Sequence, residues 1–192
     1  ATTEIYTLSL HDALPVWRKA SDIAEAMPGH ESALWEKEVA NFHCELASDH
    51  LANSRFSEAL SELRRALDMN RKSVRASMLL GDLHAAQGDD QEALEAWKKV
   101  ESQNPVYLAL VAERLMDAYR RLGSLEQGMQ LLRSYLEKYP SLDLLDALFQ
   151  WELQKEGASA AYHLVRDELQ RNPTLLGLDR KSTRLNSSHR IR

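Results

Sequence analysis

The amino-acid sequence predicts an all-helical protein, a right-handed solenoid of repeated helix–turn–helix units. Two spacings predict this class. Gly88 and Gly123 occur in equivalent turns 35 residues apart, and Pro105, Pro140 and Pro173 follow successive units at intervals of 35 and 33 residues. No stretch alternates apolar and polar residues as a half-buried strand would. Helix pairs of this length bury their apolar faces against their neighbours, so several in a row form one continuous core.

The composition suits one globular or repeat domain. Of 192 residues, 44% are hydrophobic and 28% are charged, as in ordinary folded proteins. Cys44 is the only cysteine, which excludes an internal disulfide and favours a reducing compartment. The longest apolar run, residues 106–112, is far shorter than the roughly 20 residues of a membrane-spanning helix. We therefore expect no membrane insertion by this chain and a soluble, cytoplasmic location for it.

Both ends differ from the middle. Residues 1–15 and residues 179–192 resemble in-frame translations of the two common short-read sequencing adapters. We expect both segments to be non-native tails and exclude them from the functional argument. The remaining 16–178 carries 19 basic and 26 acidic residues, a net charge of −7. An acidic domain has no broad electrostatic attraction to phosphate backbones, so nucleic acid is disfavoured as a partner.

The first predicted elements form a partial repeat, 16–39. A helix over 17–27 ends at Pro28-Gly29 and is expected to be the second helix of a pair whose first helix is missing. Residues 30–38 are expected to form a loop or a short helical extension. The next repeat, about 40–73, places a turn at Asn53-Ser54 and a second helix from about Ser57 to Met69.

The clearest repeat covers about 74–107. Gly81 has no Cβ, so it allows the second helix to approach closely, and Trp97 lies on the facing stripe of that helix. A turn follows at 87–90, and Pro105 ends the unit because the residue before a proline is biased away from the α conformation. Leu80, Gly81, Ala93, Trp97 and Pro105 match the positions of the tetratricopeptide repeat.

Two further repeats are predicted at about 109–141 and 142–174. With 40–73 and 74–107 they give four whole units, more than the roughly three needed for stability. Trp35, Trp97 and Trp151 are expected to pack between helices, although tryptophan is also common in binding hot spots.

Nothing in the chain predicts catalysis, and we expect it not to be an enzyme. No nucleophile elbow, HExxH pair or phosphate-binding glycine loop is present. His43 and His50 share a helix face, but seven residues place them roughly 10 Å apart along the axis, too far for one zinc ion. Buried packing of Cys44 and the histidines is the favoured interpretation, and no cofactor is expected in this chain.

Tetratricopeptide repeats bind peptides on a concave face lined by the first helix of each pair. Positions 2, 5 and 9 of these helices are the candidate peptide-binding residues: Asn41, Cys44, Ser48, Arg75, Met78, Asp82, Leu110, Glu113, Asp117, Asp143, Asp146 and Gln150. The second half of this set is acidic, which favours a basic or mixed-charge peptide. An ordinary solvated face is the alternative.

Three stretches resemble one family. Phe42 to Ala47, then SVRASMLLG at 73–81, and LQRNPT at 169–174 are similar to lipopolysaccharide assembly protein B. The resemblance covers roughly 16–178 and is strongest over 40–105.

The resemblance implies an adaptor at the cytoplasmic face of the bacterial inner membrane. Family members help a membrane AAA protease degrade the deacetylase that commits lipid A synthesis. They also have an N-terminal membrane anchor and a C-terminal zinc module with two Cys pairs, and zinc is expected only in that module. An unrelated tetratricopeptide scaffold, such as a chaperone-like or secretion-assembly module, is the alternative.

Overall fold

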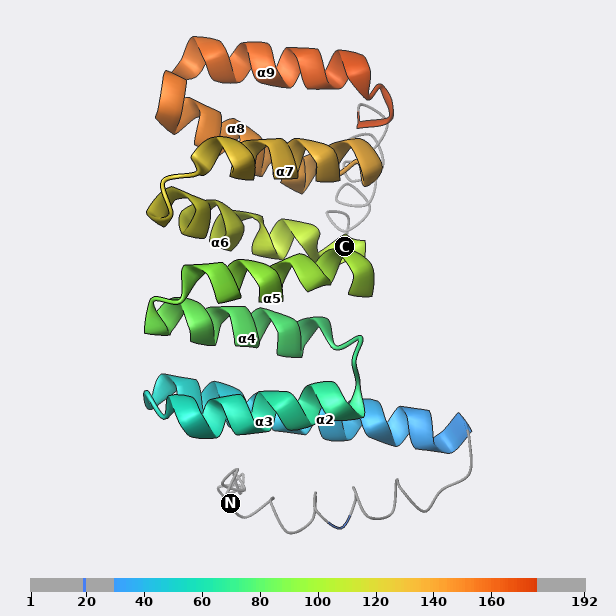
Figure 1. Cartoon of the computed structure of the whole chain (residues 1–192). Coiled ribbons are helices and arrows are strands. Elements are labelled where there is room, and N and C mark those ends of the chain that lie inside the picture. The colour runs from blue at the N-terminus through green and yellow to red at the C-terminus, as the bar shows by residue number, and fades with distance from the viewer. Residues whose placement is uncertain (1–18, 20–29, 176–192) are drawn as a thin grey trace, which may run out of the picture. The chain divides into compact units, whose positions relative to one another are not determined.

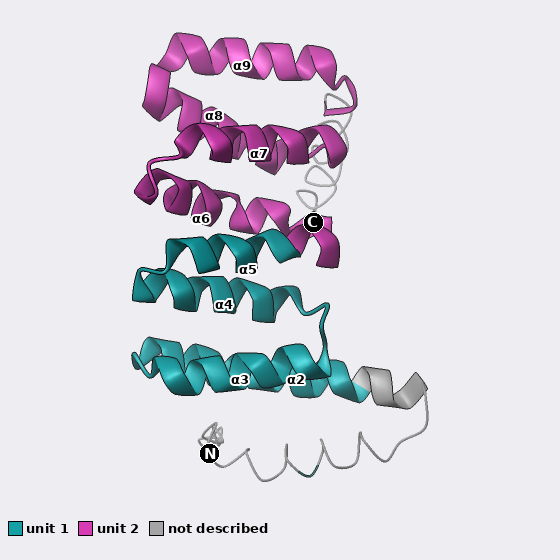
Figure 2. Cartoon of the chain, viewed as in Figure 1, with its two compact units in different colours: residues 1–99 teal, residues 100–192 magenta. Residues whose placement is uncertain are grey.

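The computed structural model describes residue 19 and residues 30–175, and every regular element within them is a helix (Figure 1). The predicted non-native tails, 1–15 and 179–192, and the predicted helix over 17–27 lie outside this part, except for residue 19. The chain divides into two compact units, residues 1–99 and residues 100–192 (Figure 2). None of the described helices is both long enough and apolar enough to cross a bilayer.

Unit 1 contains α2 (His30–Ala52), α3 (Phe56–Met69) and α4 (Val74–Gln87), together with most of α5 (Asp90–Gln103). The segment over 30–38, predicted as a loop or a helical extension, is the first part of the long helix α2. Small and branched residues at helical spacing form the core, and its fully buried members are Ala40, Cys44, Ala47, Ala59, Leu63, Ala66, Ala76 and Leu83. At its edge, the Nδ1 atom of His43 lies 2.6 Å from a Glu62 carboxylate oxygen, which joins α2 to α3.

The close approach predicted at Gly81 is present. A Cβ atom added at Gly81 would overlap the indole ring of Trp97. The ring is fixed in this position because its Nε1–H donates to the Met78 carbonyl oxygen at 3.1 Å. Glycine is therefore required on α4 so that α5 can lie against it.

Each turn between two paired helices contains a residue with positive φ. Gly88 has φ 84°, and the next amide, that of Asp89, donates to the His84 carbonyl oxygen at 2.9 Å. Ser54, at the equivalent place between α2 and α3, has φ 57° and is the non-glycine residue with positive φ in the described part of the chain. This backbone conformation favours glycine, so Ser54 is strained relative to Gly88.

Unit 2 contains the short 3₁₀ helix η1 (Pro105–Tyr107), then α6 (Leu108–Arg121), α7 (Leu125–Lys138), α8 (Leu142–Glu156) and α9 (Ala158–Arg171). Its core comes from the inner faces of these helices and includes Leu108, Val111, Leu115, Met116, Leu132, Tyr135, Leu136, Leu144, Leu148, Ala161 and Leu164. Ion pairs between Lys138 and Glu101, and between Lys155 and Glu126, join neighbouring helices at the surface.

The three tryptophans predicted to pack between helices behave differently. Trp97 and Trp151 are buried, at 2% and 8% exposure, as predicted. Trp35 is 40% exposed, so the packing prediction is wrong for this residue. Trp35 lies in the first part of α2, beyond the stretch where α3 and α4 supply the described core.

Candidate functional site: an acidic groove between α6 and α8

One stripe of α6 faces away from the core of unit 2. Ala109, Glu113 and Asp117 recur every four residues and Arg120 follows three residues later, so all four lie along one side of the helix. The opposite side carries the buried residues of α6, among them Val111 and Leu115. This division of the helix leaves polar side chains free to line a surface hollow.

Helix α8 presents a matching stripe. Asp143, Asp146 and Gln150 are exposed, while Leu144 and Leu148 are buried on the other side of the helix. Gln150 lies one turn after Asp146 and its Nε2 atom is 3.4 Å from an Asp146 carboxylate oxygen.

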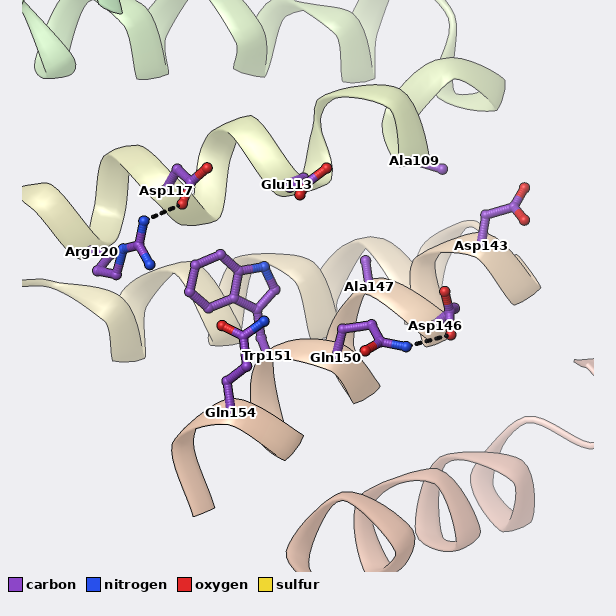
Figure 3. A pocket seen from close by; sticks show the side chains of 10 residues that line it. All are labelled: Ala109, Glu113, Asp117, Arg120, Asp143, Asp146, Ala147, Gln150, Trp151 and Gln154. Atoms are coloured by element: carbon purple, nitrogen blue, oxygen red, sulfur yellow. Dashed lines mark hydrogen bonds and ion pairs between the residues drawn. The ribbon is translucent and has the colours of Figure 1, made fainter. Parts of the chain in front are cut away.

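The two stripes line one groove of about 430 Å³ (Figure 3). Five of the sequence-predicted binding residues come together here: Glu113, Asp117, Asp143, Asp146 and Gln150. Ala109, Arg120, Ala147, Trp151 and Gln154 complete the lining. Leu110, which the sequence placed at the start of this stripe, lies outside the groove at 54% exposure, and Ala109 takes its place. Ala109 is one full turn before Glu113, whereas Leu110 is rotated away from that line.

Arg120 and Trp151 are groove residues that the sequence analysis did not assign to binding. The Arg120 guanidinium donates to an Asp117 carboxylate oxygen at 2.7 Å and lies 5.4 Å from the centre of the Trp151 ring. This cation–π contact bridges α6 and α8 at that end of the groove. A signal for Arg120 was present, because it lies three residues after Asp117 on the same stripe.

The groove is acidic overall. Four carboxylates, from Glu113, Asp117, Asp143 and Asp146, face it, against the single guanidinium of Arg120. The Arg120–Asp117 ion pair leaves the other three carboxylates as the excess charge. A ligand with Lys or Arg side chains would complement this field, and the attraction would weaken with salt.

The predicted residues of unit 1 have a different character. Asn41 and Arg75 are exposed, and Ser48, Met78 and Asp82 are half-buried. The Arg75 guanidinium lies 2.7 Å from the Glu45 carboxylate, which links α4 to α2 and lowers the pKa of the Glu45 carboxyl. This stripe is therefore of mixed charge.

The assignment of Cys44 to the binding face is wrong. Its side chain is fully buried in the core of unit 1, and burial raises the pKa of the thiol. Cys44 has the helical phase of the predicted stripe, but the neighbouring helices cover it. Among the described residues, no group of three or more His, Cys, Asp or Glu side chains is arranged to hold a metal ion.

Comparison with known sequences agrees with the geometry. The tetratricopeptide-repeat family profile matches residues 44–105, and a second profile of the same repeat matches residues 113–141. These matches identify tetratricopeptide repeats in two stretches of the chain. These repeats form a scaffold class without catalytic chemistry of its own, and the all-helical fold predicted from the sequence is confirmed.

The chain is similar to lipopolysaccharide assembly protein B. It is 28% identical to the protein from Escherichia coli strain K12 over 168 residues, which is 88% of this chain and 43% of that protein. It is 28% identical to the Haemophilus influenzae protein over 169 residues, 88% of this chain and 42% of that protein. The chain thus spans less than half the length of these relatives.

Solved structures agree on the fold alone. The match to the crystal structure of MamA protein covers 85% of this chain and 93% of the MamA chain, with a TM-score of 0.51 and 14% sequence identity. The likeness lies in the arrangement of the helical repeats.

Proposed function

We propose that this chain is the repeat module of an adaptor that regulates lipopolysaccharide synthesis. The observation that carries the proposal is the similarity to lipopolysaccharide assembly protein B over 88% of the chain, from two bacterial species. In this proposal the adaptor promotes proteolysis of the deacetylase that commits lipid A synthesis. Its partners are that deacetylase and a membrane AAA protease, at the cytoplasmic face of the inner membrane.

The mechanism of the proposal is tethering. One surface of the chain holds the deacetylase and another part of the complete adaptor contacts the protease, which raises the effective concentration of one protein near the other. No bond is made or broken by the chain itself. The acidic groove between α6 and α8 is the substrate-holding surface, because its excess carboxylates complement a basic segment.

The experiment measures binding of the purified deacetylase to the immobilised full chain. Asp143→Lys with Asp146→Lys reverses the charge of the groove wall at two exposed positions. We expect this double variant to weaken binding at least ten-fold at low salt, since like charges then face each other. Glu137→Lys with Glu156→Lys is the matched control, because it makes the same change of charge at exposed positions of unit 2 outside the groove.

The outcomes separate the adaptor proposal from an unrelated tetratricopeptide scaffold. Weaker binding by the groove variant alone supports the proposal. Equal loss in both double variants would show that net charge, and not the groove, governs the interaction. If the folded chain binds neither the deacetylase nor the protease, the proposal fails and an unrelated tetratricopeptide scaffold becomes the better account.

A further inference from the structure

A second hollow lies beside the acidic groove and is apolar. Val106, Tyr139, Pro140 and Leu142 are among the residues that line about 580 Å³ at the junction of η1 with the start of α8. Ala109 and Asp143, both labelled in Figure 3, line this hollow as well as the acidic groove, so the two hollows adjoin.

The local structure of η1 holds an apolar side chain in solvent. The Asn104 side-chain oxygen accepts from the Val106 amide at 3.2 Å and caps the 3₁₀ turn. The Val106 side chain is 83% exposed, and Leu110, one turn later, is 54% exposed. Val106 extends the apolar lining of the hollow to the surface, and a contiguous apolar patch of this kind marks a surface that another chain can cover.

The spacing along α6 fits an extended peptide. Ala109 and Glu113 are four residues apart on the helix, or about 6 Å along its axis. In an extended strand, side chains on the same side are two residues apart, or about 6.6 Å. A peptide that runs along α6 therefore places one side chain beside Ala109 and the next on that side beside Glu113.

We propose that one extended segment of the partner protein occupies both hollows, with an apolar side chain beside Val106 and Ala109 and a basic side chain two positions away, between Glu113 and Asp146. The ligand pattern is apolar–any–basic. This inference rests on the proposed function, since it takes the acidic groove as the binding surface. It adds the apolar anchor and the spacing, which together make the groove selective among basic segments.

The test uses three synthetic peptides and the full chain, with affinities from NMR titration of the isotope-labelled protein. The peptide SKSLSKS carries the pattern in both chain directions, SKSSSKS lacks the anchor, and SSKLKSS has the same composition with the wrong spacing. We expect SKSLSKS to bind about ten-fold more tightly than SKSSSKS, as burial of most of a leucine side chain predicts. SSKLKSS is expected to lose most of that advantage because its lysines point to the opposite side.

Val106→Ser removes the apolar wall at a solvent-exposed position without disturbing the core. We expect it to abolish the difference between SKSLSKS and SKSSSKS while leaving the affinity for SKSSSKS unchanged. Tyr162→Ser, at an exposed position of α9 outside both hollows, is the matched control and should change neither affinity.

Three results would overturn the inference: equal affinities for all three peptides, an anchor effect that survives Val106→Ser, or no peptide binding at all. Equal affinities that fall together in the Asp143→Lys, Asp146→Lys variant would still leave the proposed function standing. Failure of the deacetylase to bind the chain would instead overturn the proposed function.

Discussion

In both units a glycine of one helix lies against a large side chain of the paired helix, but the two units place the glycine on different helices. The helix pairs are α4 with α5 in unit 1 and α6 with α7 in unit 2. In unit 1 the glycine is Gly81 on the first helix, and the second helix supplies the Trp97 ring that lies against it. In unit 2 the glycine is Gly128 on the second helix, and the first helix supplies the Tyr119 ring.

A shift of 35 residues aligns the two pairs. The residues that correspond under this shift are Gly81 and Met116, Trp97 and Leu132, His84 and Tyr119, and Ala93 and Gly128. The two glycines of these helix contacts, Gly81 and Gly128, are each replaced by a larger residue in the other unit. The repeat thus constrains how much volume fills the space between paired helices, and not which helix provides it, as expected for cores that tolerate volume-conserving exchange.

The largest expected effect comes from placing the unit 2 residue in unit 1. Gly81→Met should lower the free energy of unfolding by about 3 kcal/mol, because the added side chain overlaps an indole ring held by its hydrogen bond to Met78. Trp97→Leu alone should cost about 2 kcal/mol for the space it leaves. Urea unfolding followed by circular dichroism measures both.

The double variant tests the comparison itself. Gly81→Met with Trp97→Leu recreates the pairing of Met116 with Leu132, so its cost should be smaller than the sum of the single costs by at least about 1 kcal/mol. If the two costs simply add, the volumes at 81 and 97 are not exchanged as a pair and the comparison is wrong.

A smaller, reciprocal effect is expected at the turns. Gly88→Ser should lower the free energy of unfolding by about 1 kcal/mol, since φ is 84° although a Cβ there would meet no neighbour. Ser54→Gly should raise it by up to about 1 kcal/mol, because the serine already has φ 57°. Thermal unfolding of the two variants should shift the midpoint in opposite directions, and shifts of the same sign would contradict the turn argument.

The smallest effect is expected at Gly128. A Cβ there would lie 2.8 Å from the Met116 sulfur and 2.9 Å from a Tyr119 ring carbon, but the thioether is flexible and can move. The gain in helix propensity from Gly128→Ala, about 1 kcal/mol, offsets most of the crowding. We expect a change within about 0.5 kcal/mol in urea unfolding. A loss as large as that of Gly81→Met would show that Tyr119 is as rigid as Trp97.

Periodicity predicted the fold because it reports directly on helix faces. The recurrence of Gly88 and Gly123 and the Gly81–Trp97 approach follow from spacing and from the missing Cβ, and both are present in the structure. The exchange of large and small residues in unit 2 was not predicted, since a sequence does not state which of two facing side chains fills a given space.

The candidate site was predicted in part for the same reason. Helical phase brought Glu113, Asp117, Asp143, Asp146 and Gln150 to one groove. Helical phase alone does not show whether a neighbouring helix covers a residue. Cys44 was therefore placed on the binding face although it is buried. Nor does phase report contacts across helices, so the Arg120–Trp151 contact came only from the structure.

The most direct test of the account follows the indole N–H signals of the chain during titration with the purified deacetylase. Trp151 lines the groove in unit 2, whereas Trp97 is buried in unit 1 with its N–H bonded to Met78. Tryptophan-to-phenylalanine variants assign the signals. The account predicts that the Trp151 signal shifts in proportion to occupancy while the Trp97 signal stays in place. A bound deacetylase that leaves the Trp151 signal unchanged would contradict the groove as the binding surface.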